Sequence, residues 1–184
     1  TDWSLQIPAL SRQYFLDSVA YCSYLILLAN PESIQSLAVN SLTDQVAFWA
    51  NATDSGVLFA ESDSPVSLKE RFGLLVLYYG TGGLTWAKKL FWGTEQEVCA
   101  WDGVGCNLSV EESSCRVVGV ALINNRLSGD LPNELCCLPC LERLDFRNNR
   151  LSGTVPQCLM EKNTELTLEG TLLTQALENT DIFE

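Results

Sequence analysis

The sequence contains no histidine, and its 11 lysines and arginines stand against 23 aspartates and glutamates, for a net charge of −12. Without histidine, a Ser-His-Asp or Cys-His nucleophilic site and a histidine metal site are excluded. The basic residues form no stripe along the sequence, so it lacks the Lys and Arg clusters that bind phosphates. We therefore expect no nucleic-acid partner, and we interpret the acidity as favouring solubility.

The sequence also lacks an apolar run long enough to span a membrane. Its longest useful uncharged apolar run, residues 18–31, ends in Asn30-Pro31 and predicts a buried helix rather than a membrane span. The sequence begins at Thr1 rather than at Met, which fits the removal of a targeting segment.

Other signs of chemistry are weak. The pair Glu111-Glu112 is more typical of an exposed loop than of an acid–base site, and GTGG at 80–83 lacks the Lys and Ser/Thr of a phosphate loop. The five tryptophans suggest a carbohydrate platform, but Trp86, Trp92 and Trp101 lie where the cap needs a core. We expect no enzyme activity, no cofactor and no metal.

The chain has eight cysteines: Cys22, Cys99, Cys106, Cys115, Cys136, Cys137, Cys140 and Cys158. An even number at this density indicates disulfides formed in an oxidising compartment. Zinc binding is the alternative because CCLPC at 136–140 has suitable thiol spacing, but a second matching CxxC is missing. Two glycosylation sequons, at Asn51 and Asn107, are compatible with secretion.

Two segments of the chain are nearly identical: VVGVALINNRLSGDLP at 117–132 and LERLDFRNNRLSGTVP at 141–156, which lie 24 positions apart. The offset holds at seven pairs of positions: Val117/Leu141, Val120/Leu144, Leu122/Phe146, Asn125/Asn149, Leu127/Leu151, Gly129/Gly153 and Pro132/Pro156. We infer that one structural unit is used twice.

The residue types within this unit have physical reasons. Leu144 and Phe146 alternate like a strand with one buried face, and Asn149 follows where the chain must turn. An amide side chain there can both donate to and accept from backbone groups of neighbouring coils, and Asn125 has this role one coil earlier. A single coil cannot cover its own apolar face, so the coils are expected to stack.

The pattern LxxLxLxxNxLxGxLP at a 24-residue period resembles the plant-type leucine-rich repeat. The resemblance implies short parallel strands on a concave face and extended or 3₁₀ segments on a convex face. Residues 157–184 are interpreted as a degenerate third copy that closes the stack, with Leu166 and Leu168 as strand residues and no Asn for the ladder. The expected fold is therefore α+β, a short solenoid of two full repeats plus a degenerate one.

CAWDGVGC at 99–106, followed by CRVVGVAL at 115–122, resembles the N-terminal cap of this repeat family. The resemblance implies a Cys99–Cys106 disulfide, with Trp101 covering the open edge of the first coil. Two further pairings are expected: Cys115 with Cys140, and Cys158 with Cys136 or Cys137.

We expect three regions: a helical region at 1–65, the cap at 66–116, and the repeats with a closing cap at 117–184. The pattern of residues 8–47 predicts helices, with a break at Asn30-Pro31-Glu32. After the break, several apolar residues lie near helical spacing: Ile34, Leu37, Ala38, Leu42 and Val46.

In the cap, Ser64-Pro65 predicts the start of a helix that ends at Gly80, and Leu90-Phe-Trp-Gly93 is expected to supply aromatics for the core. Residues 71–93, leading into CAWDGVGC, are similar to the cap region of leucine-rich-repeat surface proteins of algae. Residues 29–42 resemble the helical segment that precedes that cap.

The outward positions of the repeat strands are the candidate site. Arg143 and Arg147 flank Asp145, which predicts either a solvated, self-neutralised face or a contact patch whose Arg groups bind carboxylates or carbonyls. The outward apolar Ile123 favours contact. The candidate partner-binding residues are Ile123, Asn124, Arg143, Asp145, Arg147 and Asn148.

Two functions follow as hypotheses. The first is a recognition module, secreted or at the cell surface, that binds a protein or glycan through a short concave face. The second is a structural accessory subunit docked on a larger assembly, such as a membrane-bound complex in a thylakoid-like organelle lumen. An ice- or mineral-binding surface would need regular Thr or Asp arrays, which the sequence lacks.

Overall fold

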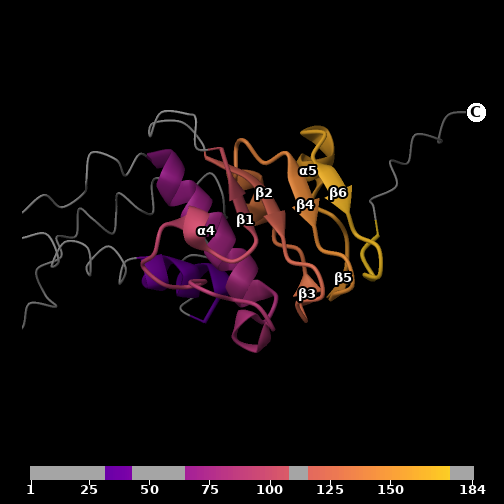
Figure 1. Cartoon of the computed structure of the whole chain (residues 1–184), viewed down its shortest axis with the longest axis horizontal. Coiled ribbons are helices and arrows are strands. Elements are labelled where there is room, and N and C mark those ends of the chain that lie inside the picture. Colours follow the sequence, from indigo (N-terminus) through magenta and orange to yellow (C-terminus); the bar gives the residue numbers. More distant parts are fainter. Residues whose placement is uncertain (1–31, 43–64, 108–115, 175–184) are drawn as a thin grey trace, which may run out of the picture.

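Four short strands lie side by side in one open sheet, in the order β1-β2-β4-β6 (Figure 1). The structure is a computed structural model that describes residues 32–42, 65–107 and 116–174. The strands are β1 (Val104–Cys106), β2 (Val117–Ala121), β4 (Arg143–Asp145) and β6 (Glu165–Thr167). Strand β1 is antiparallel to β2, whereas β2, β4 and β6 are parallel to their neighbours.

The register of the parallel strands follows the sequence repeat. Val120 lies opposite Leu144, and Leu144 lies opposite Leu166. The side chains of Val120 and Leu144 are 2% and 1% exposed, and Leu141, Phe146 and Leu151 are also buried. The repeated apolar positions therefore form one core, as the sequence predicts. The step from β4 to β6 is 22 residues, two fewer than the step from β2 to β4.

The other side of the repeats consists of short elements. Strands β3 (Ser128–Asp130) and β5 (Arg150–Ser152) form a second, two-stranded parallel sheet. The 3₁₀ helix η4 (Asn133–Cys137) and the helix α5 (Gln157–Glu161) complete the two coils. In Figure 1, β3 and β5 lie at the lower end of the molecule and α5 at its upper end.

The cap is built around α4 (Pro65–Gly80), which begins and ends where the sequence predicts. It is followed by the 3₁₀ helices η2 (Gly83–Thr85) and η3 (Val98–Ala100). Residues Phe72, Leu74, Leu75, Val76 and Leu77 are all at most 1% exposed, so α4 is buried on nearly every side. It packs closely on η4, because a Cβ at Gly73 would lie 2.7 Å from the backbone oxygen of Glu134.

The helix at 34–42 is confirmed, whereas the prediction that residues 90–93 supply aromatics for the core is wrong in part. Residues 34–42 are helical as expected, but Ile34 and Leu37 are 38% and 45% exposed, while Ala38, Val39 and Leu42 form the buried face. In the cap, Trp86 and Trp92 are each 4% exposed as predicted, but Phe91, the other aromatic expected in the core, is 39% exposed. The chain turns at Phe91, whose φ is 65°, so consecutive side chains cannot all point into the core.

Several predictions lie outside the described residues: the helical segment 8–31, Val46, Cys22, Cys115, the Asn51 sequon, Glu111-Glu112, and the closing segment 175–184. The division into regions 1–65, 66–116 and 117–184 stays a prediction. None of the helices in the described ranges is long and apolar enough to cross a membrane.

Candidate functional site

The candidate site is the outward side of the β1-β2-β4-β6 sheet, which we call the sheet face. The strand register aligns its side chains in two rows across three strands: Gly119–Arg143–Glu165 and Ala121–Asp145–Thr167. All six residues are exposed or half-buried, whereas the residues between them point into the core. Of the predicted site residues, these rows contain Arg143 and Asp145, which the alternation of a half-buried strand places on the same face.

The part of the sheet face on β1 and β2 has small, uncharged side chains. Gly105 lies opposite Gly119, and Ala121 follows two positions later. Beyond the strand, Ile123 is half-buried, and the next residue, Asn124, donates from its backbone N–H to the carbonyl of Arg147 at 3.0 Å. A flat apolar strip therefore borders the charged residues of β4.

Asp145 and Arg147 bind each other. The Arg147 Nε donates to Asp145 Oδ1 at 2.9 Å, and its second guanidinium nitrogen donates to Asp145 Oδ2 at 2.7 Å. The hydrogen bonds from Arg147 lower the pKa of Asp145 below its ordinary value of 3.8. Both charges are thus neutralised within one strand and its following turn.

Arg143 is held much less tightly. Its side chain is 73% exposed, and its Nε lies 3.9 Å from Glu165 Oε2, whose side chain is 72% exposed. An ion pair of this length between exposed groups contributes little. Of the two arginines on the sheet face, Arg143 therefore has the more accessible guanidinium.

Asn124 and Asn148 have a conformational reason to be asparagine. Their φ values are 53° and 56°, in the left-handed region that Asn tolerates better than most residues. Gly170 occupies the same position in the third coil, with φ 73°. The backbone conformation therefore explains why asparagine stands at these two positions, and a binding partner is not needed to explain it.

The Asn ladder has the predicted chemistry. The Asn149 side chain accepts from the backbone N–H groups of Asn125 and Leu127 at 3.0 Å each. It donates to the carbonyls of Leu122 at 2.7 Å and Phe146 at 2.9 Å. One amide thus bridges the two coils.

Asn125 makes the corresponding bridge from the first coil to the cap. Its side-chain oxygen accepts from the N–H of Lys88 at 2.5 Å, and its amide nitrogen donates to the Lys88 carbonyl at 2.8 Å. Asn125 is fully buried. The ladder therefore continues past the repeats into the cap.

In the third coil the ladder position is occupied by Thr171, which the repeat pattern of the sequence does not reveal. Its hydroxyl donates to the Leu168 carbonyl at 2.7 Å, as Asn149 does to Phe146, and accepts from the N–H of Leu173 at 3.4 Å. Because the third coil is two residues shorter, the fixed offset of 24 does not reach Thr171.

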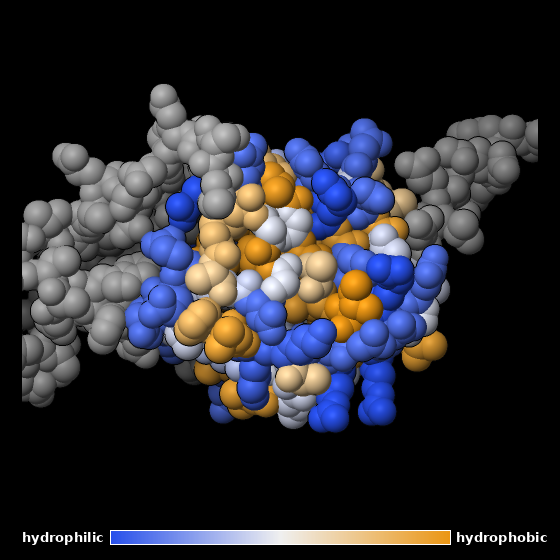
Figure 2. Space-filling view, viewed as in Figure 1, coloured by the Kyte–Doolittle hydropathy of each residue, from blue (hydrophilic) through white to orange (hydrophobic). Residues whose placement is uncertain are grey.

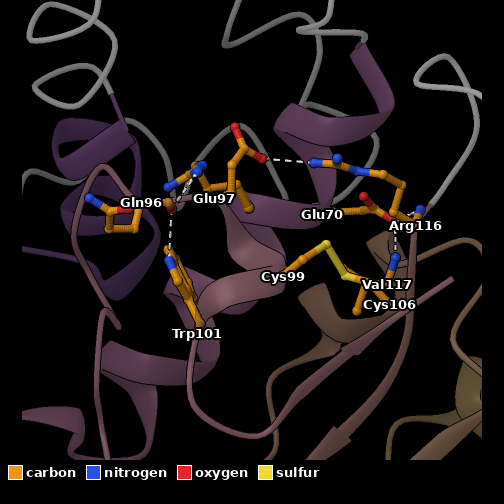
Figure 3. The surroundings of a disulfide bond; sticks show 9 residues. Glu70, Gln96, Glu97, Cys99, Trp101, Cys106, Arg116 and Val117 are labelled. Atoms are coloured by element: carbon orange, nitrogen blue, oxygen red, sulfur yellow. Dashed lines mark hydrogen bonds and ion pairs between the residues drawn. A yellow bond between two sulfur atoms is a disulfide. The ribbon is translucent and has the colours of Figure 1, made fainter. Parts of the chain in front are cut away.

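The cap site surrounds Trp101 (Figure 3). Cys99 and Cys106 are joined in a disulfide, and Trp101 between them is 2% exposed. The indole N–H donates to the Gln96 carbonyl at 2.9 Å, and the Arg71 guanidinium lies 5.2 Å from the ring centroid. Trp101 is therefore a core residue held by the polar backbone and a cation.

The remaining cysteines are also oxidised in the described part of the chain. Cys158 is bonded to Cys136 rather than to Cys137, with a Cα–Cα distance of 5.9 Å. Cys137 and Cys140 are also in disulfide bonds. The predicted partner of Cys140, Cys115, lies outside the described residues, as do the last two residues of the Asn107 sequon. Asn107 itself is exposed directly after β1.

The structure adds a buried carboxylate that sequence reasoning did not find. Glu70 on α4 is 1% exposed, and its Oε1 accepts from the N–H groups of Arg116 at 2.9 Å and Val117 at 3.0 Å (Figure 3). Burial raises the pKa of Glu70. Among the described residues, no cluster of three or more Cys, Asp or Glu side chains could hold a metal ion.

One sequence-family model and one solved structure are similar to parts of this chain. The sequence model of the family described as Leucine Rich Repeat matches residues 140–161. The crystal structure of a plant ice-binding protein is similar to this chain at 24% sequence identity and a TM-score of 0.45, over 57% of this chain and 33% of that one. This chain therefore spans about a third of the length of the solved structure that it matches. The family match supports a leucine-rich-repeat protein, a kind that is typically a non-catalytic interaction module.

Proposed function

We propose that this chain forms a short leucine-rich-repeat solenoid that binds a protein partner through the sheet face, with a glycan as the other candidate ligand. The observation that carries the proposal is the exposure of Arg143, which lies opposite Gly119 of the flat strip and whose guanidinium is engaged, within the described part of the chain, only by a long ion pair with Glu165. A guanidinium can bind a carboxylate or a backbone carbonyl of a partner, and the strip lets that partner approach closely.

The proposal is tested by capture from the native source on the immobilised protein. We expect one component to be retained by the wild-type protein and lost on Arg143→Glu and on Ala121→Arg, which reverse a charge and add bulk on the sheet face. Glu161→Gln, at an exposed position on α5, is the matched control and should retain the component. Equal retention by all four proteins would exclude the sheet face as the binding surface.

A structural accessory subunit of a larger assembly is the second candidate. It is favoured by the exposed apolar side chains of Ile34 and Leu37 on the helix at 34–42. Burying these two side chains in an assembly would remove apolar surface from water. If this reading holds, Leu37→Ser should convert an aggregating isolated protein into a monomer in size-exclusion chromatography. A wild-type protein that is already monomeric would favour the recognition module.

The disulfides are compatible with an extracellular or lumenal location. Within that range, we propose secretion or the cell surface, with an organelle lumen as the alternative. Secretion would fit glycosylation at Asn107, which is exposed. A mass shift on treatment of the native protein with an endoglycosidase would test it.

A further inference from the structure

Four basic residues that are scattered in the sequence come together at one edge of the fold. We call this set the basic edge: Lys88, Lys89, Arg126 and Arg150, all exposed. The three segments that meet here, residues 84–91, 124–130 and 148–154, contain these four cations and a single acidic residue, Asp130. In a chain of net charge −12, this is a marked local reversal of sign.

Backbone hydrogen bonds place the basic edge. Lys88 is fixed to the first coil by its two bonds with the Asn125 side chain, and Arg126 follows Asn125 directly. The N–H of Arg150 donates to the Leu127 carbonyl at 2.8 Å, one coil further. The Lys89 ammonium donates to the Leu84 carbonyl, so Lys89 also lies against this turn.

Exposed leucines flank the basic edge on both sides. Leu84 and Leu90 in the cap are 76% and 62% exposed, and Leu172 in the third coil is 75% exposed. Leu172 occupies the position of Arg150, because its N–H donates to the carbonyl of Leu151 at 2.8 Å. In Figure 2, hydrophilic residues project from the lower edge, below β3 and β5, and hydrophobic residues lie on either side of them.

Two residues of this edge other than glycine have a backbone conformation with positive φ, which glycine adopts more easily. Among the described residues, five other than glycine have positive φ, and three of these are asparagines. The two exceptions are Phe91, at 65°, and Arg126, at 64°. Both belong to the segments that form this edge, so an aromatic and a cation are kept exposed at strained positions.

We propose that the basic edge docks the protein on an anionic lipid surface. The cations would lie among the lipid headgroups, and Leu84, Leu90 and Leu172 would enter the boundary between headgroups and acyl chains. A folded acidic partner would need a separate pocket for each projecting leucine, whereas a bilayer accepts protruding apolar side chains without one. The anionic surface would repel the acidic remainder of the protein, so the basic edge would also fix the orientation of the protein on the membrane.

The proposal is tested by co-sedimentation of the full chain with vesicles. Wild-type protein is expected to bind vesicles of phosphatidylcholine with a minor fraction of phosphatidylserine, and to bind phosphatidylcholine alone much more weakly. Each removed charge should weaken binding about fivefold, so Arg126→Gln with Arg150→Gln should weaken it roughly 25-fold. The matched control is Arg143→Gln, which removes one exposed arginine from the sheet face, and it should bind vesicles as the wild type does.

A second double variant measures the contribution of the exposed leucines to vesicle binding. Leu84→Ser with Leu172→Ser should weaken vesicle binding while the thermal midpoint of unfolding is kept, because both side chains are exposed. Binding that does not depend on phosphatidylserine, or that survives the double arginine substitution, would overturn the proposal. Retention on immobilised polyglutamate without any vesicle binding would also overturn it, in favour of an acidic polypeptide at this edge.

Discussion

The carboxylate of Glu70, in the middle of α4, accepts a hydrogen bond from the backbone N–H of Val117, the first residue of β2, at 3.0 Å. The same oxygen accepts from the N–H of Arg116, so one cap side chain pairs two backbone donors at the start of the first repeat strand. The second oxygen, Oε2, is buried without a hydrogen-bond partner. The cap and the repeats are therefore joined by the buried, ionisable carboxylate of Glu70.

Glu70→Gln is expected to change how stability depends on pH. Burial raises the pKa of Glu70 above its ordinary value of 4.5, although the bonds to Val117 and Arg116 oppose this. The folded protein then holds the proton more tightly than the unfolded chain, so the contribution of Glu70 is full below pH 4.5 and declines as the pH rises through the folded pKa. The free energy of unfolding of the wild type, relative to Glu70→Gln, should therefore fall with rising pH in urea titrations.

The control for this measurement is Glu97→Gln. Glu97 binds the Arg116 guanidinium at 2.7 Å but its side chain is 63% exposed. Its removal breaks an exposed ion pair and should lower the free energy of unfolding by at most about 1 kcal/mol. A stability difference between the wild type and Glu70→Gln that stays constant with pH would contradict the raised pKa.

Asn149→Ala should destabilise the protein strongly. It would leave two buried N–H groups and two carbonyls without the side chain that now pairs them. A loss of about 3 kcal/mol or more is expected, because each unsatisfied buried group costs about 1–3 kcal/mol. The neighbour provides a matched control: Asn148→Ala affects an exposed residue with positive φ and should cost only about 1 kcal/mol. Equal losses in denaturant titrations would show that the ladder contributes nothing particular.

The core of the repeats could be predicted because the same chemistry recurs at a fixed offset. Val120 and Leu144 are aligned and buried as the repeat requires, and Asn149 makes the predicted bonds in both directions. Thr171 was missed because the third coil is two residues shorter and its hydroxyl replaces only part of the amide chemistry.

Contacts between distant segments leave no such pattern. Glu70 and Val117 are 47 residues apart and neither position recurs, so nothing in the sequence pairs them. Phe91 and Trp92 are both expected in the core as aromatics, but a turn at Phe91 directs only Trp92 inward. The basic edge depends on how the cap turn meets the first coil, which composition along the chain does not reveal.

Asp145→Asn tests whether the sheet face is self-neutralised. Hydrogen bonds from Arg147 lower the pKa of Asp145 below its ordinary value of 3.8, so its stabilising contribution is present above that pH and is lost as the pH falls through the folded pKa. Because the Arg147 side chain is 41% exposed, the loss at neutral pH should be at most about 1 kcal/mol. Urea titrations should show the wild type and the variant converging only in strong acid. Convergence already above pH 3.8 would contradict the paired arrangement.

Phe91→Gly separates stability from docking at the basic edge. Phe91 is 39% exposed with φ 65°, so glycine should relieve backbone strain and change the free energy of unfolding by no more than about 1 kcal/mol, in the stabilising direction. Phe91→Ala keeps the strain and removes the ring, so it should be no more stable than the wild type. Because both variants lose the exposed ring, both should bind phosphatidylserine-containing vesicles more weakly than the wild type. Thermal unfolding and vesicle co-sedimentation on the same samples measure the two effects. If Phe91→Gly is less stable than the wild type and binds vesicles equally well, the ring of Phe91 contributes to packing and not to docking.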